Sequence, residues 1–143
     1  MQPSDIIAII AIVVSVGNVV FQLIWEKHLN TKEKKTALYK EAYKDIFLDE
    51  LPLAKQKIQY TQYKLTGVND MEEIMHSIRQ KAYVFDFIDK NFKKNVFKLA
   101  QEIEDLLVKN EDASMTNEEY RKYYENLECK LKEIYDLVFK KMF

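Results

Sequence analysis

The sequence predicts an all-α protein, for three reasons. Only 2 of its 143 residues are Gly and 2 are Pro, apolar residues recur at helical spacing, and no segment alternates at period two for long. A chain of this length has room for one small helical core. We therefore expect one N-terminal helix over residues 1–26, followed by a bundle of four to five helices over residues 27–143.

The N-terminal helix is predicted from residues 6–25, which contain no charged side chain. As a helix this run is about 30 Å long, which is the thickness of the hydrocarbon core of a bilayer. A secretory signal peptide would need a basic start, which the first five residues lack. A buried helix of a water-soluble fold is the other alternative, but few residues remain to wrap it. The run predicts a transmembrane helix that continues into a long helix beyond the lipid.

Basic residues follow this run and none precedes it. The positive-inside rule then places the N-terminus outside and the bundle in the cytoplasm, as in a single-pass protein of the bacterial inner membrane. The lone Cys129 agrees with a reducing compartment. The residues that set this orientation are Lys27, His28, Lys32, Lys34 and Lys35.

A stripe of small and polar residues lies within the apolar run, at spacings of three and four that place it in an arc of about 80°. Small residues allow close helix approach, and amides in hydrocarbon need partners. We expect this stripe to be an oligomer interface or a pore lining. The alternatives are a lone anchor or contact with a different protein. The stripe consists of Ala8, Ala11, Ser15, Asn18 and Gln22.

The bundle is predicted from apolar stripes that recur at three- and four-residue spacing. The long first helix should end or kink at Pro52. A second helix should end at Gly67, a third should begin at Asn69, and a capping box from Thr116 to Glu119 should open the last. The helices after Pro52 are expected over residues 53–65, 69–88, 92–107 and 120–142.

Lys and Arg gather at the junction of the third and fourth predicted helices. This excess could bind RNA, an acidic partner or anionic lipid, although it could also be an ordinary solvated helix face. With 22 basic and 23 acidic residues overall, we expect no direct DNA binding. The candidate partner-binding patch is Arg79, Lys81, Lys90, Lys93, Lys94 and Lys98.

Catalytic chemistry has little support in the sequence. The motif from Glu73 to His76 has the spacing of half a carboxylate di-metal site, but no second copy of it exists. No nucleophile motif or Gly-rich phosphate loop is present. We therefore expect no catalytic residues, no metal and no cofactor.

One N-terminal span, a basic stretch beside it and a helical bundle together resemble a known family. This family consists of the small membrane-anchored, HEPN-like, pore-forming accessory proteins of type VI-B CRISPR antiviral systems. The HEPN ribonuclease pair of Arg followed closely by His is missing, because no His follows Arg79 or Arg121. The resemblance implies a homo-oligomeric membrane assembly or pore in antiphage defence, beside an RNA-guided nuclease or another defence protein. The alternatives are a membrane-tethered binding module for a protein or RNA, and a degenerate HEPN-type RNase.

Overall fold

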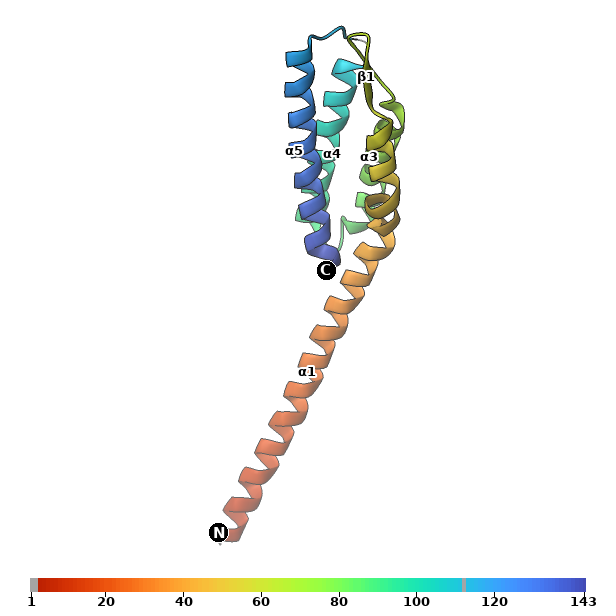
Figure 1. Cartoon of the computed structure of the whole chain (residues 1–143). Helices are drawn as coiled ribbons and strands as arrows, with labels where there is room; N and C mark the ends of the chain where they lie inside the picture. The colour runs from red at the N-terminus through yellow and green to blue at the C-terminus, as the bar shows by residue number, and fades with distance from the viewer. Residues whose placement is uncertain (1–2, 112) are drawn as a thin grey trace. The chain divides into compact units, whose positions relative to one another are not determined.

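The computed structural model describes residues 3–111 and 113–143, with the side chains of residues 14–27, 31–111 and 113–143 (Figure 1). The described part is mostly helical, as predicted, and it also contains a short hairpin. It divides into two compact units, Met1–Leu38 and Tyr39–Phe143. The elements in chain order are α1 (Pro3–Asp45), the π-helical turn η1 (Ile46–Glu50), α2 (Leu51–Lys57), β1 (Gln59–Thr61), β2 (Lys64–Thr66), α3 (Asn69–Ala82), the 3-10 turn η2 (Tyr83–Phe85), α4 (Lys90–Asn110) and α5 (Asn117–Met142).

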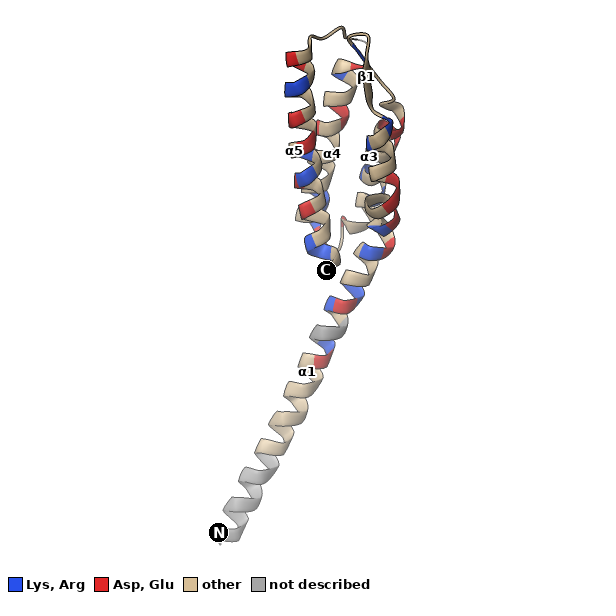
Figure 2. Ribbon diagram, in the orientation of Figure 1, with Lys and Arg blue, Asp and Glu red and all other residues tan. Residues whose placement is uncertain are grey.

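The first helix is long, as expected. It continues without a break through Asn30 and Thr31, and the Thr31 hydroxyl donates a hydrogen bond to the Lys27 carbonyl oxygen at 2.8 Å. Figure 2 shows an uncharged stretch in the described part of this helix, followed by charged residues. Ala8 and Ala11 of the predicted stripe, and His28 of the predicted basic stretch, lie outside the described side chains.

The predicted transmembrane helix is contradicted. Within the part of the chain that the structure describes, no helix combines the length and the apolar character needed to cross a membrane. The described apolar stretch of α1, Val14 to Trp25, is about 18 Å long at 1.5 Å per residue, against about 30 Å of hydrocarbon. Glu26 and Lys27 follow it directly, and residues 6–13 of the predicted span lie outside the described side chains. The predicted single-pass inner-membrane location is corrected with it, whereas the bilayer as a partner and the pore are not tested by this finding.

Pro52 neither ends the helical path nor opens a loop. The Leu51 N–H donates to the Ile46 carbonyl, five residues back, so the turn before the proline is widened. Proline has no N–H, and its ring crowds the carbonyl four residues earlier. A π-helical turn gives that carbonyl room, so α2 continues directly from η1.

The predicted helix over residues 53–65 is wrong beyond Lys57. The chain forms an antiparallel hairpin instead, in which Tyr60 opposes Leu65. The two turn residues Gln62 and Tyr63 have φ of 50° and 62°, the left-handed conformation that two-residue hairpin loops require. Contacts with distant residues hold the hairpin, since the Tyr60 ring stacks on Tyr120 with centroids 4.2 Å apart.

The helices α3, α4 and α5 lie side by side (Figure 1), and their predicted apolar stripes form the core. The capping box between Thr116 and Glu119 is confirmed. Ile88 is 37% exposed and not in the core, because η2 breaks the helical register after Ala82. The predicted start of α3 at Asn69 is confirmed, and its N-cap residue Val68 makes no side-chain hydrogen bond. The largest fully buried aromatic residues are Tyr43, Phe47, Phe85 and Phe92.

Gly67 is required by geometry, although it does not cap the helix that the sequence predicted. Its φ is +76°, and a Cβ there would overlap the carbonyl oxygen of Lys57 at the end of α2. We expect Gly67→Ala to lower the free energy of unfolding by about 2 kcal/mol or more, measured by urea denaturation.

Gly17→Ala is the matched control for this substitution. A Cβ at Gly17 would meet nothing within 4 Å, and alanine favours a helix over glycine by about 0.5–1 kcal/mol. The control should therefore not destabilise the chain. Equal urea midpoints for the two variants would contradict the packing assigned to Gly67.

Candidate functional site

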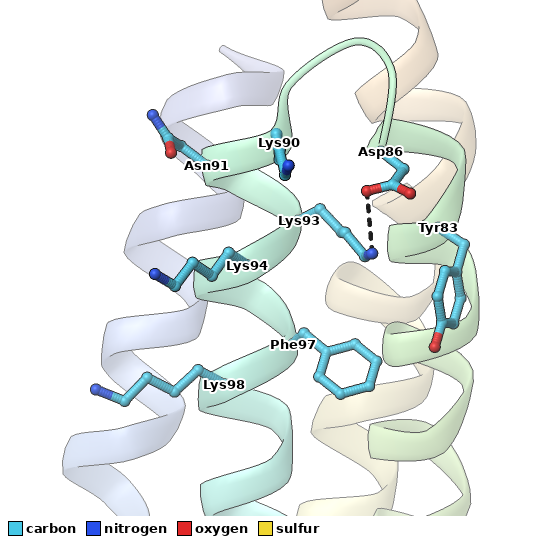
Figure 3. Close-up of a pocket in the computed structure, with 8 residues that line it drawn as sticks. All are labelled: Tyr83, Asp86, Lys90, Asn91, Lys93, Lys94, Phe97 and Lys98. Atoms are coloured by element: carbon cyan, nitrogen blue, oxygen red, sulfur yellow. Dashed lines mark hydrogen bonds and ion pairs between the residues drawn. The ribbon is translucent and has the colours of Figure 1, made fainter.

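A groove of about 620 Å³ lies on the surface of the bundle, beside η2 and the first turns of α4 (Figure 3). Four lysines and a single carboxylate line it, so its side chains carry a local charge of about +3 although the whole chain carries −1. The lining residues are Tyr83, Asp86, Lys90, Asn91, Lys93, Lys94, Phe97 and Lys98.

Asp89 fixes where α4 begins and therefore where the groove residues lie. One carboxylate oxygen accepts a hydrogen bond from the Phe92 N–H at 3.0 Å, which caps the helix. The other accepts from the Tyr39 hydroxyl at 2.9 Å and from Lys141 Nζ at 2.7 Å. Partial burial disfavours the ionised form, but the hydrogen bonds from Lys141, Phe92 and Tyr39 outweigh it and hold the pKa of Asp89 below its ordinary value.

Two aromatic rings contact each other on one side of the groove. Tyr83 and Phe97 meet edge to face, with centroids 5.9 Å apart and planes at 75°. Lys93 Nζ lies 4.8 Å from the centre of the Tyr83 ring and 3.0 Å from Asp86 Oδ1, so the one carboxylate of the groove is already paired. The Tyr83 side chain remains available, because the residue is 56% exposed.

Three lysines form a row along α4. Lys90, Lys94 and Lys98 are four residues apart and so lie on one helical face. Figure 3 shows Lys94 and Lys98 extending in the same direction, away from Phe97. Lys98 is 3.7 Å from Glu102. Among the residues that the structure describes, no carboxylate oxygen lies within 4.0 Å of the other two lysines.

Four of the six residues of the predicted basic patch line this groove, and Arg79 and Lys81 do not. The Arg79 guanidinium pairs with Glu104 and with the Gln101 side chain, and it lies 5.5 Å from the centre of the Phe97 ring. Its positive charge is therefore paired with Glu104 in the contact between α3 and α4. The sequence prediction missed four lining residues, although the aromatic residue three positions after Lys94 was a usable signal. The missed residues are Tyr83, Asp86, Asn91 and Phe97.

A second candidate surface belongs to the N-terminal unit and is described by itself. On α1 the three described members of the predicted stripe, Ser15, Asn18 and Gln22, are exposed. The apolar side chains around them are exposed as well. Phe21 and Trp25 stack on each other with centroids 5.9 Å apart.

Several buried polar atoms without a hydrogen-bond partner in the described part of the chain lie outside both surfaces. Glu72 Oε1 and the Tyr123 hydroxyl are two of four buried side-chain atoms with no hydrogen-bond partner among the described residues, and the other two, Arg79 Nε and Glu104 Oε2, belong to the ion pair between α3 and α4. Burial, and then the charges of Glu111 and Glu104, raise the pKa of Glu72. The residues that the structure describes contain no group of three His, Cys, Asp or Glu side chains that could hold a metal ion.

Comparison of the chain with protein-family models, with curated proteins and with solved structures finds no match. The resemblance to HEPN-like accessory proteins therefore stays a prediction.

Replacement of Asp89 tests its role at the start of α4. The pKa of Asp89 is lowered by folding, so its carboxylate stabilises the fold above the unfolded-state pKa of about 3.9, and this contribution is lost as the pH falls through the folded-state value. We expect Asp89→Asn to lower the free energy of unfolding by about 1–3 kcal/mol at pH 7 and by much less near pH 2, measured by urea denaturation.

Asp136→Asn is the control, because Asp136 is an exposed carboxylate on α5. Its effect should stay within about 0.5 kcal/mol at both pH values. A loss for Asp89→Asn that is the same at pH 7 and pH 2 would contradict a contribution from the ionised carboxylate.

Proposed function

We propose that this chain is a self-associating helical protein, whose copies assemble through the apolar segment of α1. The proposal assigns no catalytic step to the chain. A role in antiviral defence, which the family resemblance implies, stays a prediction.

The observation that carries the proposal is the exposure of apolar side chains along residues 14–25. Eight of them are between 49% and 64% exposed; Trp25 lies on the side of the polar stripe, seven residues after Asn18, and the others lie around the rest of the helix. A helix that is apolar nearly all round is normally buried, and contiguous exposed apolar patches mark interaction sites. These side chains are Val14, Val16, Val19, Val20, Phe21, Leu23, Ile24 and Trp25.

Other copies of the same helix can supply the missing cover. Burial of apolar surface contributes about 25 cal/mol per Å², so each pair of apolar side chains brought together favours assembly. Helices that associate in this way align their apolar faces at three- and four-residue spacing. Val16, Val20 and Ile24 have that spacing and lie opposite Asn18. We assign the contact between copies to this face.

The polar stripe takes a different role in this assignment. The sequence predicts it to be an oligomer interface or a pore lining because amides in hydrocarbon need partners, and no described helix can cross a membrane. Ser15, Asn18 and Gln22 can keep hydrogen bonds with water when the apolar face is the contact. The two assignments lead to opposite results when one charge is placed on either face.

The test is the mass of the full chain, measured by sedimentation velocity over a range of concentrations. We expect the wild-type chain to sediment as a multiple of 17.1 kDa. Val20→Lys should weaken association by about tenfold or more, because it places a charge in an apolar contact. Asn18→Lys adds the same charge on the opposite face and should leave the mass unchanged.

Trp25 gives a second readout, because it is the only tryptophan of the chain and is 56% exposed. Because Trp25 follows Asn18 by seven residues and lies on the same side of the helix, its emission should change little on assembly through the opposite face, whereas a blue shift would assign the contact to the polar stripe. A monomer at every concentration would refute the proposal. Dissociation by Asn18→Lys but not by Val20→Lys would instead assign the interface to the polar stripe.

A further inference from the structure

We propose that the groove beside α4 and the lysine row next to it bind single-stranded nucleic acid, with phosphates on the lysines and bases against the exposed rings. This inference is independent of self-association, because the groove belongs to the unit Tyr39–Phe143 and the apolar segment of α1 belongs to the other unit.

The regular spacing of the lysines is the first argument. Lys90, Lys94 and Lys98 follow one another at about 6 Å along the helix axis. A single strand carries one negative charge for each nucleotide, so it presents a regular row of charges to this row of ammonium groups. Lys90 and Lys94 have no carboxylate partner within the described part of the chain, so phosphates would not have to displace an existing ion pair.

The rings beside the lysines are the second argument. Proteins that bind single strands combine a basic groove with aromatic side chains on which bases stack. Tyr83 is 56% exposed and meets Phe97 in the groove. Phe87, which directly follows the groove residue Asp86, is 97% exposed. A buried role in the bundle therefore does not account for these two exposed rings.

The combination of rings and charges favours a nucleic acid over an acidic protein. A strand carries a planar base beside each phosphate, which matches a surface with lysines on one side of α4 and the rings of Phe97 and Tyr83 on the other (Figure 3). An acidic polypeptide matches the lysines alone. A duplex fits poorly, because its bases are stacked inside and cannot reach the rings. The near-neutral composition of the chain conceals this local excess, since the acidic residues lie elsewhere.

The experiment measures binding of the full chain to fluorescein-labelled 20-mers of uridine and of thymidine, by fluorescence anisotropy at 50–300 mM KCl. The two strands have the same phosphate spacing along the chain and differ in the 2′-hydroxyl and the thymine methyl group, so their relative affinity shows whether the RNA or the DNA strand is preferred. The groove variant is Lys90→Gln/Lys94→Gln/Lys98→Gln. The matched control removes the same charge from exposed lysines elsewhere, as Lys109→Gln/Lys132→Gln/Lys140→Gln.

We expect the groove variant to bind at least about tenfold more weakly than the wild-type chain at 50 mM KCl. The affinity of the control variant should fall by less than about threefold. The slope of log affinity against log salt should decrease in magnitude by about 2 in the groove variant, since each phosphate contact with a single strand contributes about 0.7. Tyr83→Ala should weaken binding by about tenfold with an unchanged slope, because stacking releases no counterions.

Three outcomes would overturn the proposal. The first is no anisotropy change with either strand at 50 mM KCl. The second is an equal loss of affinity in the groove variant and in its charge-matched control. The third is competition by polyglutamate as effective as that by unlabelled uridine 20-mer, which would assign the surface to an acidic protein. Circular dichroism melting of each variant separates lost binding from lost folding, and Tyr83→Ala should melt normally because its side chain is exposed.

Discussion

The carboxylate of Asp89 is the point on which the arrangement of the bundle depends. It joins the end of α1 through Tyr39, the start of α4 through the Phe92 N–H, and the end of α5 through Lys141. These partners lie far apart in the sequence, and each supplies a donor that the ionised carboxylate accepts. Because a charged acceptor with several donors is stabilised most when it is shielded from water, this junction fixes the helix start better than a surface cap could.

The groove follows from that junction. Once α4 begins at Lys90, its first turns present lysines on one face and Phe97 on the next, toward Tyr83 of η2. Arg79 is drawn into the contact between α3 and α4 by Glu104. The lysines, with their flexible stems, remain at the surface. A basic side chain that finds a carboxylate on a neighbouring helix, as Arg79 does, holds the helices together. A basic side chain without such a partner remains available at the surface.

The two candidate surfaces have opposite physical character. The segment of α1 from Val14 to Trp25 offers apolar contact without charge, whereas the groove offers charge and aromatic rings. Self-association through the first would bring several grooves into one assembly. Several weak contacts with one strand would then act together, since linked sites raise the effective local concentration of each other's ligand.

The helices were largely determined by the sequence itself. The stripes that contain Met71, Val96 and Leu127 lie in the core as predicted, because apolar residues at three- and four-residue spacing have one way to be buried together. The capping box at Thr116 was predictable for a similar reason, since both of its hydrogen bonds are local. Four lysines of the groove were also found from the local excess of basic residues in the sequence.

What the sequence could not determine depended on contacts between distant residues. The hairpin after Lys57 has no glycine in its turn, and it is held by Tyr120 and by the Met115 N–H, which donates to the Tyr63 carbonyl. The pairing of Arg79 with Glu104 and the meeting of Tyr83 with Phe97 likewise needed α3, η2 and α4 in place. The predicted membrane span failed for a different reason, because it was inferred from hydropathy alone and no described helix has the required apolar length. Local spacing determines which face of a helix is apolar, but only the tertiary structure decides what covers that face and which charges remain free.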